Sequence, residues 1–157
     1  MDIKQLIEKQ KELDARIEER IDAKPGELLY DRYMAFKVEL CEMLNADGEF
    51  KFWKQSHEAD RSKVLEEYVD ALHFILSIGI AAGVRDGSEK GFKTWRSFIV
   101  TADHLMMNDL DHIMRNWHSF FREFLGLGDM LGFSEEEITE AYLSKNEVNH
   151  KRQDNDY

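Results

Sequence analysis

The chain has 157 residues, of which 43% are hydrophobic and 34% charged, and its 21 basic and 32 acidic side chains give a formal net charge of -11. This hydrophobic share argues against a disordered acidic chain, and the length predicts one domain over residues 1–157. The acidic excess argues against nucleic acid and anionic membranes as main partners, because both attract positive surfaces. A single cysteine, Cys41, and an N-terminus without an apolar leader segment predict a cytoplasmic protein.

Two helices are predicted in the first third of the chain. Apolar residues recur at helical spacing from Leu6 to Ile21, which predicts a first helix that ends near residues 25–26. A second helix is expected over residues 28–44, followed by a stop at residues 45–48. One side of this second helix would carry Tyr30, Met34, Val38 and Cys41.

The middle of the chain combines a strong helical pattern with an irregular one. Asp60 or Ser62 can cap a third helix, which the apolar pattern carries on to Gly83. Residues 84–100 contain two glycines and predict a variable connector, with a short helix around Trp95 and Phe98.

Two more helices complete an all-α fold of about five main helices. The fourth is expected over residues 103–125, with an end at Gly126-Leu127-Gly128. The fifth begins at Ser134-Glu135-Glu136-Glu137, which has the pattern of a capping box, and is expected to fray into the polar tail 151–157.

Two pairs of carboxylates stand out on the second and third predicted helices. Glu39 and Glu42 are three residues apart, as are Glu67 and Asp70, so each pair lies on one helical face. Four carboxylates in an apolar setting would repel one another unless divalent cations neutralised them, and oxygen ligands favour Mg²⁺ or Mn²⁺ over zinc. The spacing alone is equally consistent with solvated acidic residues, because chance pairs are common in an acidic chain.

Four further segments carry a specific pattern: Gln10-Lys11-Glu12-Leu13-Asp14, Phe50-Lys51-Phe52-Trp53-Lys54, the helix from Glu66 to Phe74 and the tail from Lys145 to Gln153. Together with Glu39-x-x-Glu42 and Glu67-x-x-Asp70, they resemble a known family, the dimeric all-α dUTP diphosphatases. The two carboxylate pairs by themselves resemble the metal-binding signature of the wider superfamily of all-α nucleotide pyrophosphohydrolases, which contains the MazG-type enzymes.

This resemblance implies a fold and a reaction. The fold would be a helical bundle with a four-helix metal-binding core, assembled as a homodimer. The enzyme would hydrolyse dUTP, and also dUDP, to dUMP with Mg²⁺, releasing pyrophosphate from dUTP. The metal ligands would be Glu39, Glu42, Glu67 and Asp70, and Glu39 would be the catalytic residue that also orients the attacking water. A role for Glu39 as a ligand alone is equally compatible with the sequence.

The resemblance and the helical spacing together suggest substrate contacts. Asp70, His73 and Phe74 share one helical face, which can offer an imidazole to the sugar and an aromatic ring to the base. Trp53 is similar to the family residue that covers the uracil, although core packing would also explain Trp53 and Phe74. Gln10 carries both a donor and an acceptor and can read the uracil edge, with Asp14 one turn later on the same face.

The polar tail reverses the charge of the chain locally, and we expect residues 145–157 to bind phosphate. Lys145, Asn146 and Arg152 are the candidates there, and Lys54 is another for a phosphate or the base edge. Basic residues near the end of a helix also complement its dipole, so the pattern has a structural explanation too. Asp156 stands where the family pattern has a glycine, which puts the family's turn at that point in doubt.

Three other hypotheses fit parts of the sequence. A pyrophosphohydrolase for another nucleotide, MazG-like, would carry the same carboxylates. A ferritin-like dimetal carboxylate bundle would use Asp70-x-x-His73 and Asp109-x-x-His112, although such bundles normally carry Glu there. A helical interaction protein would present Met106, Met107 and Met114 to a partner.

Overall fold

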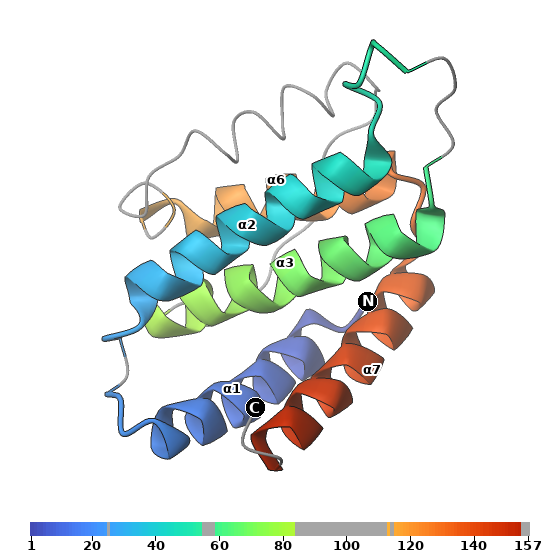
Figure 1. The fold of residues 1–157 in the computed structure, drawn as a ribbon. Helices are drawn as coiled ribbons and strands as arrows, with labels where there is room; N and C mark the ends of the chain where they lie inside the picture. The colour runs from blue at the N-terminus through green and yellow to red at the C-terminus, as the bar shows by residue number, and fades with distance from the viewer. Residues whose placement is uncertain (25, 55–58, 84–112, 114, 155–157) are drawn as a thin grey trace.

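The computed structural model describes residues 1–24, 26–54, 59–83, 113 and 115–154, and these residues form five α-helices and no strand (Figure 1). The predicted all-α class is therefore confirmed. The expected connector at residues 84–100 and the start of the expected fourth helix at residue 103 lie outside the described residues. So do Asp109, His112 and the three methionines that the alternative hypotheses invoked.

The second helix lies close to its predicted bounds, whereas the first helix ends at Arg20, before the predicted end near residues 25–26. Helix α1 (Ile3–Arg20) is capped by the Asp2 carboxylate, which accepts hydrogen bonds from the backbone N–H groups of Lys4 and Gln5. Helix α2 (Leu29–Asp47) ends at Gly48, whose φ of 72° is the left-handed conformation that glycine adopts without strain. The helix thus extends through most of the predicted stop at residues 45–48 and is capped only by the last of these residues.

The buried side of α2 faces the core and its other side stays exposed. Arg32, Phe36, Leu40 and Met43 are the buried residues of this helix. On the exposed side, Tyr30, Met34 and Val38 are 63%, 46% and 49% exposed, and Cys41 is exposed as well. The residues that the sequence placed on one side of this helix thus form an apolar surface stripe.

Helix α3 (Arg61–Ala81) lies at the centre of the fold. Asp60 caps it by accepting hydrogen bonds from the N–H groups of Ser62 and Lys63, so the first of the two predicted caps is the right one. This helix contacts α1, α2, α6 and α7, and it is buried along most of its length. A helix that is apolar around most of its surface belongs inside a fold, which explains its central place.

Helix α6 (Trp117–Met130) does not end where the sequence predicted. The helix continues through Gly126 and Gly128 and ends at Met130, and Gly132 follows with a left-handed φ of 76°. Gly128 does not end the helix but allows Tyr68 to pack closely against it, because a Cβ atom there would lie 2.6 Å from the hydroxyl oxygen of Tyr68. A glycine inside a helix thus allowed a close approach that the local sequence does not reveal.

Helix α7 (Glu135–Asp154) begins with the predicted capping box. The Ser134 hydroxyl accepts from the N–H of Glu137 at 3.1 Å, and the Glu137 carboxylate accepts from the N–H of Ser134 at 2.8 Å. The predicted fraying from residue 151 is wrong, because the helix stays regular to Asp154. Polar residues at its end, including Arg152, are therefore held on a defined helical face.

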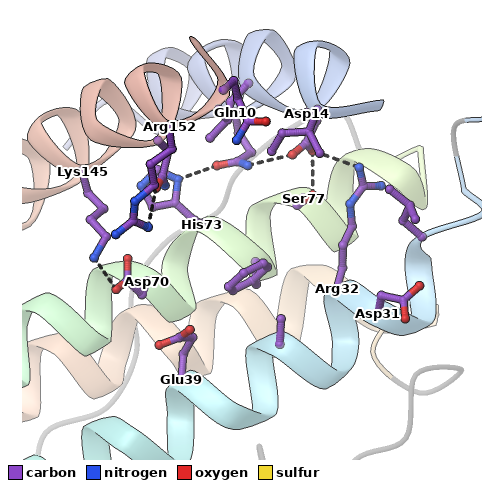
Figure 2. A pocket seen from close by; sticks show the side chains of 17 residues that line it. Gln10, Asp14, Asp31, Arg32, Glu39, Asp70, His73, Ser77, Lys145 and Arg152 are labelled. Atoms are coloured by element: carbon purple, nitrogen blue, oxygen red, sulfur yellow. Dashed lines mark hydrogen bonds and ion pairs between the residues drawn. The ribbon is translucent and has the colours of Figure 1, made fainter. Parts of the chain in front are cut away.

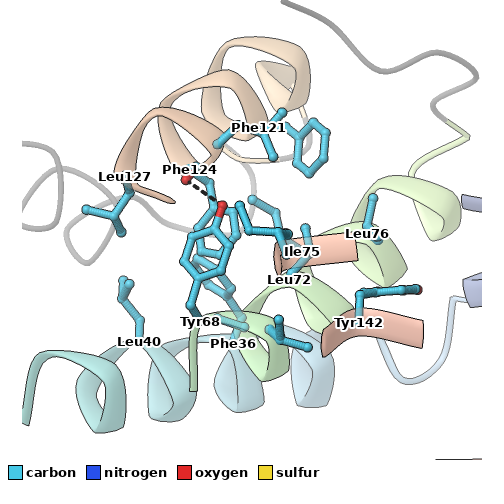
Figure 3. Close-up of a cluster of buried hydrophobic side chains, with 14 of the residues drawn as sticks. Phe36, Leu40, Tyr68, Leu72, Ile75, Leu76, Phe121, Phe124, Leu127 and Tyr142 are labelled. Atoms are coloured by element: carbon cyan, nitrogen blue, oxygen red, sulfur yellow. Dashed lines mark hydrogen bonds between the residues drawn. The ribbon is translucent and has the colours of Figure 1, made fainter. Parts of the chain in front are cut away.

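The core brings α2, α3 and α6 together, while α1 and α7 lie side by side against α3 (Figure 1). Figure 3 shows Tyr68 of α3 between the aromatic rings of α6 and the apolar side of α2. The Tyr68 ring stacks on Phe124 with ring centres 4.7 Å apart, and its hydroxyl donates to the Phe124 carbonyl at 3.3 Å. Among the described residues, no helix is both long and apolar enough to span a membrane.

Candidate active site

A pocket of about 400 Å³ lies among α1, α2, α3 and α7. Figure 2 shows that its polar side chains come from all four helices. Carboxylates of α2 and α3 stand at one end, cations of α7 reach over them, and an amide and a carboxylate of α1 line the other end. The residues that carry this arrangement are Glu39, Asp70, His73, Ser77, Lys145, Arg152, Gln10, Asp14 and Arg32.

Three of the four predicted metal ligands form an acidic cluster, which we define as Glu39, Glu67 and Asp70. One oxygen of each carboxylate lies within 4.8 Å of the others. Glu67 is 4% exposed, and the other two are half-buried. Glu42 is exposed and lies outside this group of three, although its charge acts on Glu39. Oxygen donors converging at this spacing can hold a hard divalent cation.

The acidic cluster is electrostatically costly without a cation. Burial first, and then the charges of Asp70, Glu42 and Glu67, raise the pKa of Glu39 to about 7. Burial also raises the pKa of Asp70, even though Lys145 donates to that carboxylate at 2.6 Å and acts in the opposite direction. A positive charge placed among these oxygens would relieve the repulsion.

Two lysines partly compensate the cluster. Nζ of Lys145, on α7, lies 2.6 Å from Asp70 and 3.3 Å from Glu66. Nζ of Lys63, one turn before Glu67 on α3, lies 2.6 Å from the buried Glu67 carboxylate. The two carboxylates of the cluster on α3 therefore each have a cationic partner.

A buried polar network lines the other end of the pocket (Figure 2). Nε2 of Gln10 donates to Oδ1 of Asp14 at 2.9 Å, and Oγ of Ser77 donates to Oδ2 of Asp14 at 2.6 Å. Nη2 of Arg32 lies 3.9 Å from Asp14 and 2.7 Å from Glu18. Burial raises the pKa of Asp14, while the hydrogen bonds from Ser77 and Gln10 and the charge of Arg32 oppose this shift. Gln10 and Ser77 thus donate hydrogen bonds to Asp14, and Arg32 adds a positive charge beside it.

His73 connects this network with the middle of the pocket. Its Nδ1 atom lies 2.7 Å from Oε1 of Gln10, and its ring stacks on Tyr142 with centres 4.0 Å apart. Burial lowers the pKa of His73 to about 3, with a smaller contribution from the charge of Lys145, so the ring is neutral at physiological pH. Its Nε2 atom is buried and has no hydrogen-bond partner among the described residues.

The structure brings many of the predicted substrate residues together. Gln10, Asp14, His73, Phe74, Lys145 and Arg152 all line the pocket. Asn146 does not line it, and is instead buried with its amide donating to the carbonyl of Lys9 at 3.5 Å. Trp53 and Lys54 lie on the connector after α2, are exposed and do not line the pocket. Their roles in covering uracil or binding the substrate stay predictions.

Sequence reasoning missed Arg32 and Ser77. Ser77 lies four residues after His73, on the same face of α3, and Arg32 lies seven residues before Glu39 on α2. Both spacings would have placed these residues on the active face, since positions i+4 and i+7 return to one side of a helix. The residue types of Arg32 and Ser77 alone, without this helical spacing, do not indicate a functional site.

The fold and the pocket define an all-α enzyme suited to a phosphorylated ligand, with carboxylates that can hold a divalent cation and cationic side chains opposite them. The chain belongs to the dUTPase family, because the family model described as dUTPase matches residues 2–157. It is accordingly an enzyme of nucleotide metabolism that acts on dUTP, as a dUTP diphosphatase. No curated protein matches the sequence.

Proposed function

We propose that the chain hydrolyses dUTP, and also dUDP, to dUMP in a reaction that requires Mg²⁺, and that it releases pyrophosphate from dUTP. The observation that carries this proposal is the acidic cluster, whose oxygens lie within 4.8 Å of one another beside a pocket that cations of α7 close. The family match supports the substrate, and the all-oxygen donor set supports magnesium, with Mn²⁺ as a substitute.

The residues present fit a divalent cation. Glu39, Glu67 and Asp70 would hold it, and Glu42 would join them in the complete site. The raised pKa of Glu39, at about 7, marks a charge that the metal-free site disfavours. When bound, the metal would supply positive charge to the phosphate oxygens and lower the pKa of water. Glu39 lines the pocket and would orient the attacking water.

The phosphate chain would lie between the acidic cluster and α7. Lys145 and Arg152 line the pocket from this helix. The guanidinium of Arg152 is oriented by Asn149, whose Oδ1 accepts from Nη1 at 3.4 Å. Arg can bind two phosphate oxygens at once and Lys acts as a point charge, so the pair would neutralise oxygens that the metal does not reach. The phosphate-binding role that we expect of the segment 145–157 would thus fall to Lys145 and Arg152.

The nucleoside would fill the pocket beyond His73. Phe74 is half-buried and can pack against the base. Gln10 and Asp14 can meet the uracil edge, where the carboxylate of Asp14 can accept from the N3–H group that cytosine lacks. His73 offers Nε2, which can accept only if the ring carries its proton on Nδ1. A sugar hydroxyl would satisfy this acceptor.

A nucleotide panel tests the proposal. Purified protein is assayed against dUTP, dUDP, dCTP, dTTP and UTP, with Mg²⁺ and with excess chelator. We expect turnover of dUTP and dUDP that is lost with chelator. Comparable rates for all nucleotides would contradict the uracil and deoxyribose assignment, and undiminished rates in chelator would contradict the metal requirement.

A variant links activity to the acidic cluster. Asp70→Asn keeps the size of the side chain and removes its charge, so we expect turnover to be lost while the helical circular dichroism signal survives. Retained turnover would show that the cluster is misassigned.

We further propose that the chain is a homodimer that buries the apolar stripe of α2. Tyr30, Met34 and Val38 are all more than two fifths exposed, which is unusual for large apolar side chains in one row. Sedimentation should give a dimer for the wild type and a monomer for Met34→Glu, whereas a monomeric wild type would exclude this arrangement. The cytoplasmic location inferred from Cys41 stays a prediction.

A further inference from the structure

The carboxylate of Asp14 determines which way the Gln10 amide points. Oδ1 of Asp14 lies 2.9 Å from Nε2 of Gln10, and its other oxygen already accepts from Ser77 at 2.6 Å. The hydrogen bond from Ser77 and the guanidinium of Arg32, 3.9 Å away, oppose the effect of burial and favour the ionised carboxylate. An ionised carboxylate can only accept hydrogen bonds, so Gln10 turns its NH₂ group towards Asp14. The opposite orientation would place the amide oxygen against the carboxylate, with two acceptors at hydrogen-bond distance.

The orientation of Gln10 then determines what its carbonyl oxygen meets. Oε1 lies 2.7 Å from Nδ1 of His73 and 2.8 Å from the hydroxyl of Tyr142. As an acceptor, Oε1 requires a proton on both of these partners. The Tyr142 hydroxyl can donate to it, so the remaining requirement falls on His73, whose Nδ1 must carry a proton.

A neutral imidazole carries one ring proton, so a proton on Nδ1 leaves Nε2 bare. The ring is neutral because it is 4% exposed and burial lowers its pKa to about 3. A backbone hydrogen bond with Tyr142 acts in the opposite direction and raises the pKa, but it is the smallest of the three causes, and Nε2 has no hydrogen-bond partner among the described residues. The Nε2–H tautomer, which predominates in free neutral histidine, is thereby disfavoured.

We propose that Asp14 is a positioning residue that acts through the Gln10 amide to hold His73 in the Nδ1–H tautomer, so that its Nε2 atom is a hydrogen-bond acceptor. A ligand that reaches Nε2 must therefore bring a donor. The identity of that donor as a sugar hydroxyl rests on the proposed function, whereas the direction of the network rests only on the protein.

The same network has a complete alternative once the carboxylate is gone. In Asp14→Asn, the new amide can donate to Oε1 of Gln10 after the Gln10 side chain has turned over. Nε2 of Gln10 would then donate to Tyr142 and to Nδ1 of His73, while the Tyr142 hydroxyl donates to the carbonyl of Leu6, which lies 3.2 Å away. Gln10, Tyr142 and Nδ1 of His73 each keep a partner in this arrangement, and His73 changes to the Nε2–H tautomer. Nε2 itself has no partner among the described residues in the wild type, so the exchange breaks no hydrogen bond of that atom.

The experiment is long-range ¹H–¹⁵N correlation NMR of ¹⁵N-histidine-labelled, nucleotide-free protein near neutral pH. His73→Gln assigns the ring signals by their absence. We expect a protonated, pyrrole-type Nδ1 and a bare, pyridine-type Nε2 in the wild type. The two types should be exchanged in Asp14→Asn, with the fold checked by circular dichroism.

Two control variants separate this role from general packing. Ser77→Ala removes a donor to Asp14 but leaves the carboxylate, and Tyr142→Phe keeps the stacked ring, so both should keep the wild-type tautomer. A pyrrole-type Nε2 in the wild type, or an unchanged pattern in a folded Asp14→Asn, would overturn the proposal. Because the spectra need no nucleotide, they stand apart from the hydrolysis assay, and failure of one can be told from failure of the other.

Discussion

Nζ of Lys145 lies 2.6 Å from Oδ2 of Asp70, so a cation of α7 occupies one side of the acidic cluster that α2 and α3 build. In the nucleotide-free protein this ammonium would compete with a metal ion for the carboxylate. Lys145 also lines the pocket in which we propose that the phosphate chain lies. The same side chain would therefore act on metal binding and on substrate binding in opposite directions.

Lys145→Gln should separate these two effects. We expect Mn²⁺ to bind the nucleotide-free variant several-fold more tightly, since a pair worth on the order of 1 kcal/mol no longer competes. The KM for dUTP should rise, because a phosphate contact is lost. Calorimetry measures the first effect and steady-state kinetics the second. Lys151→Gln, an exposed lysine of the same helix, is the matched control, and weaker metal binding by Lys145→Gln would contradict the competition.

Metal binding should release a proton from Glu39. Burial and three neighbouring carboxylates raise the pKa of Glu39 to about 7, so much of the metal-free protein carries this proton at pH 6. Divalent cations bind the ionised form, and the apparent affinity should therefore increase as the pH rises through 7. Calorimetry in two buffers of different ionisation enthalpy counts the protons. Glu39→Gln should abolish the release, and an unchanged proton count would show that another group titrates.

The raised pKa of Glu39 also makes the stability of the folded protein depend on pH. The folded protein keeps the Glu39 proton up to about pH 7, whereas the unfolded chain loses it near 4.5. The folded state thus binds more protons in this window, and the stabilisation present below pH 4.5 is lost as the pH rises towards 7. In chelator, the melting temperature should fall more steeply with rising pH for the wild type than for Glu39→Gln. Parallel curves would exclude a shift of this size.

Glu67→Gln and Glu66→Gln form a matched pair on α3. Both carboxylates pair with Lys63, but Glu67 is buried within the acidic cluster and Glu66 is exposed. We expect kcat/KM to fall by about 100-fold or more for Glu67→Gln, and by less than about threefold for Glu66→Gln. Equal losses would assign the effect to Lys63 instead of to the cluster.

Gly128→Ala should destabilise the core. The added Cβ would lie 2.6 Å from Oη and 2.8 Å from Cζ of Tyr68, a buried ring that cannot move freely. We expect a loss of about 1–3 kcal/mol, as is typical of overpacking. Removing the hydroxyl in Gly128→Ala/Tyr68→Phe should recover part of this loss, measured by chemical denaturation. Full additivity of the two single changes would argue against the contact.

Local features of this protein were determined by the sequence alone, because they depend on neighbours within one turn. Asp60 and the Ser134–Glu137 capping box satisfy backbone N–H groups two or three residues away, and both were found from residue types. The apolar spacing likewise gave the helices of the all-α class. The segments that resemble dUTP diphosphatases carried the family, which the match over residues 2–157 confirms.

The tertiary structure alone decided features that join distant parts of the chain. Gly128 was interpreted as a helix end because its partner Tyr68 is far away in the sequence, and only packing shows why a Cβ is excluded there. Helical spacing paired Glu67 with Asp70, but the approach of Glu39 to them depends on how α2 packs against α3.

The direction of the hydrogen bonds in the pocket likewise depends on the tertiary structure and could not be predicted from the sequence. Gln10 and His73 were both candidates from sequence, yet what each offers a ligand depends on Asp14 and Tyr142, which reach them from α1 and α7. A carboxylate can only accept, and this constraint passes from side chain to side chain through space. The sequence determined which donors and acceptors the protein has, and the packing of its helices decided which of them face one another, because hydrogen bonds depend on distance and not on order along the chain.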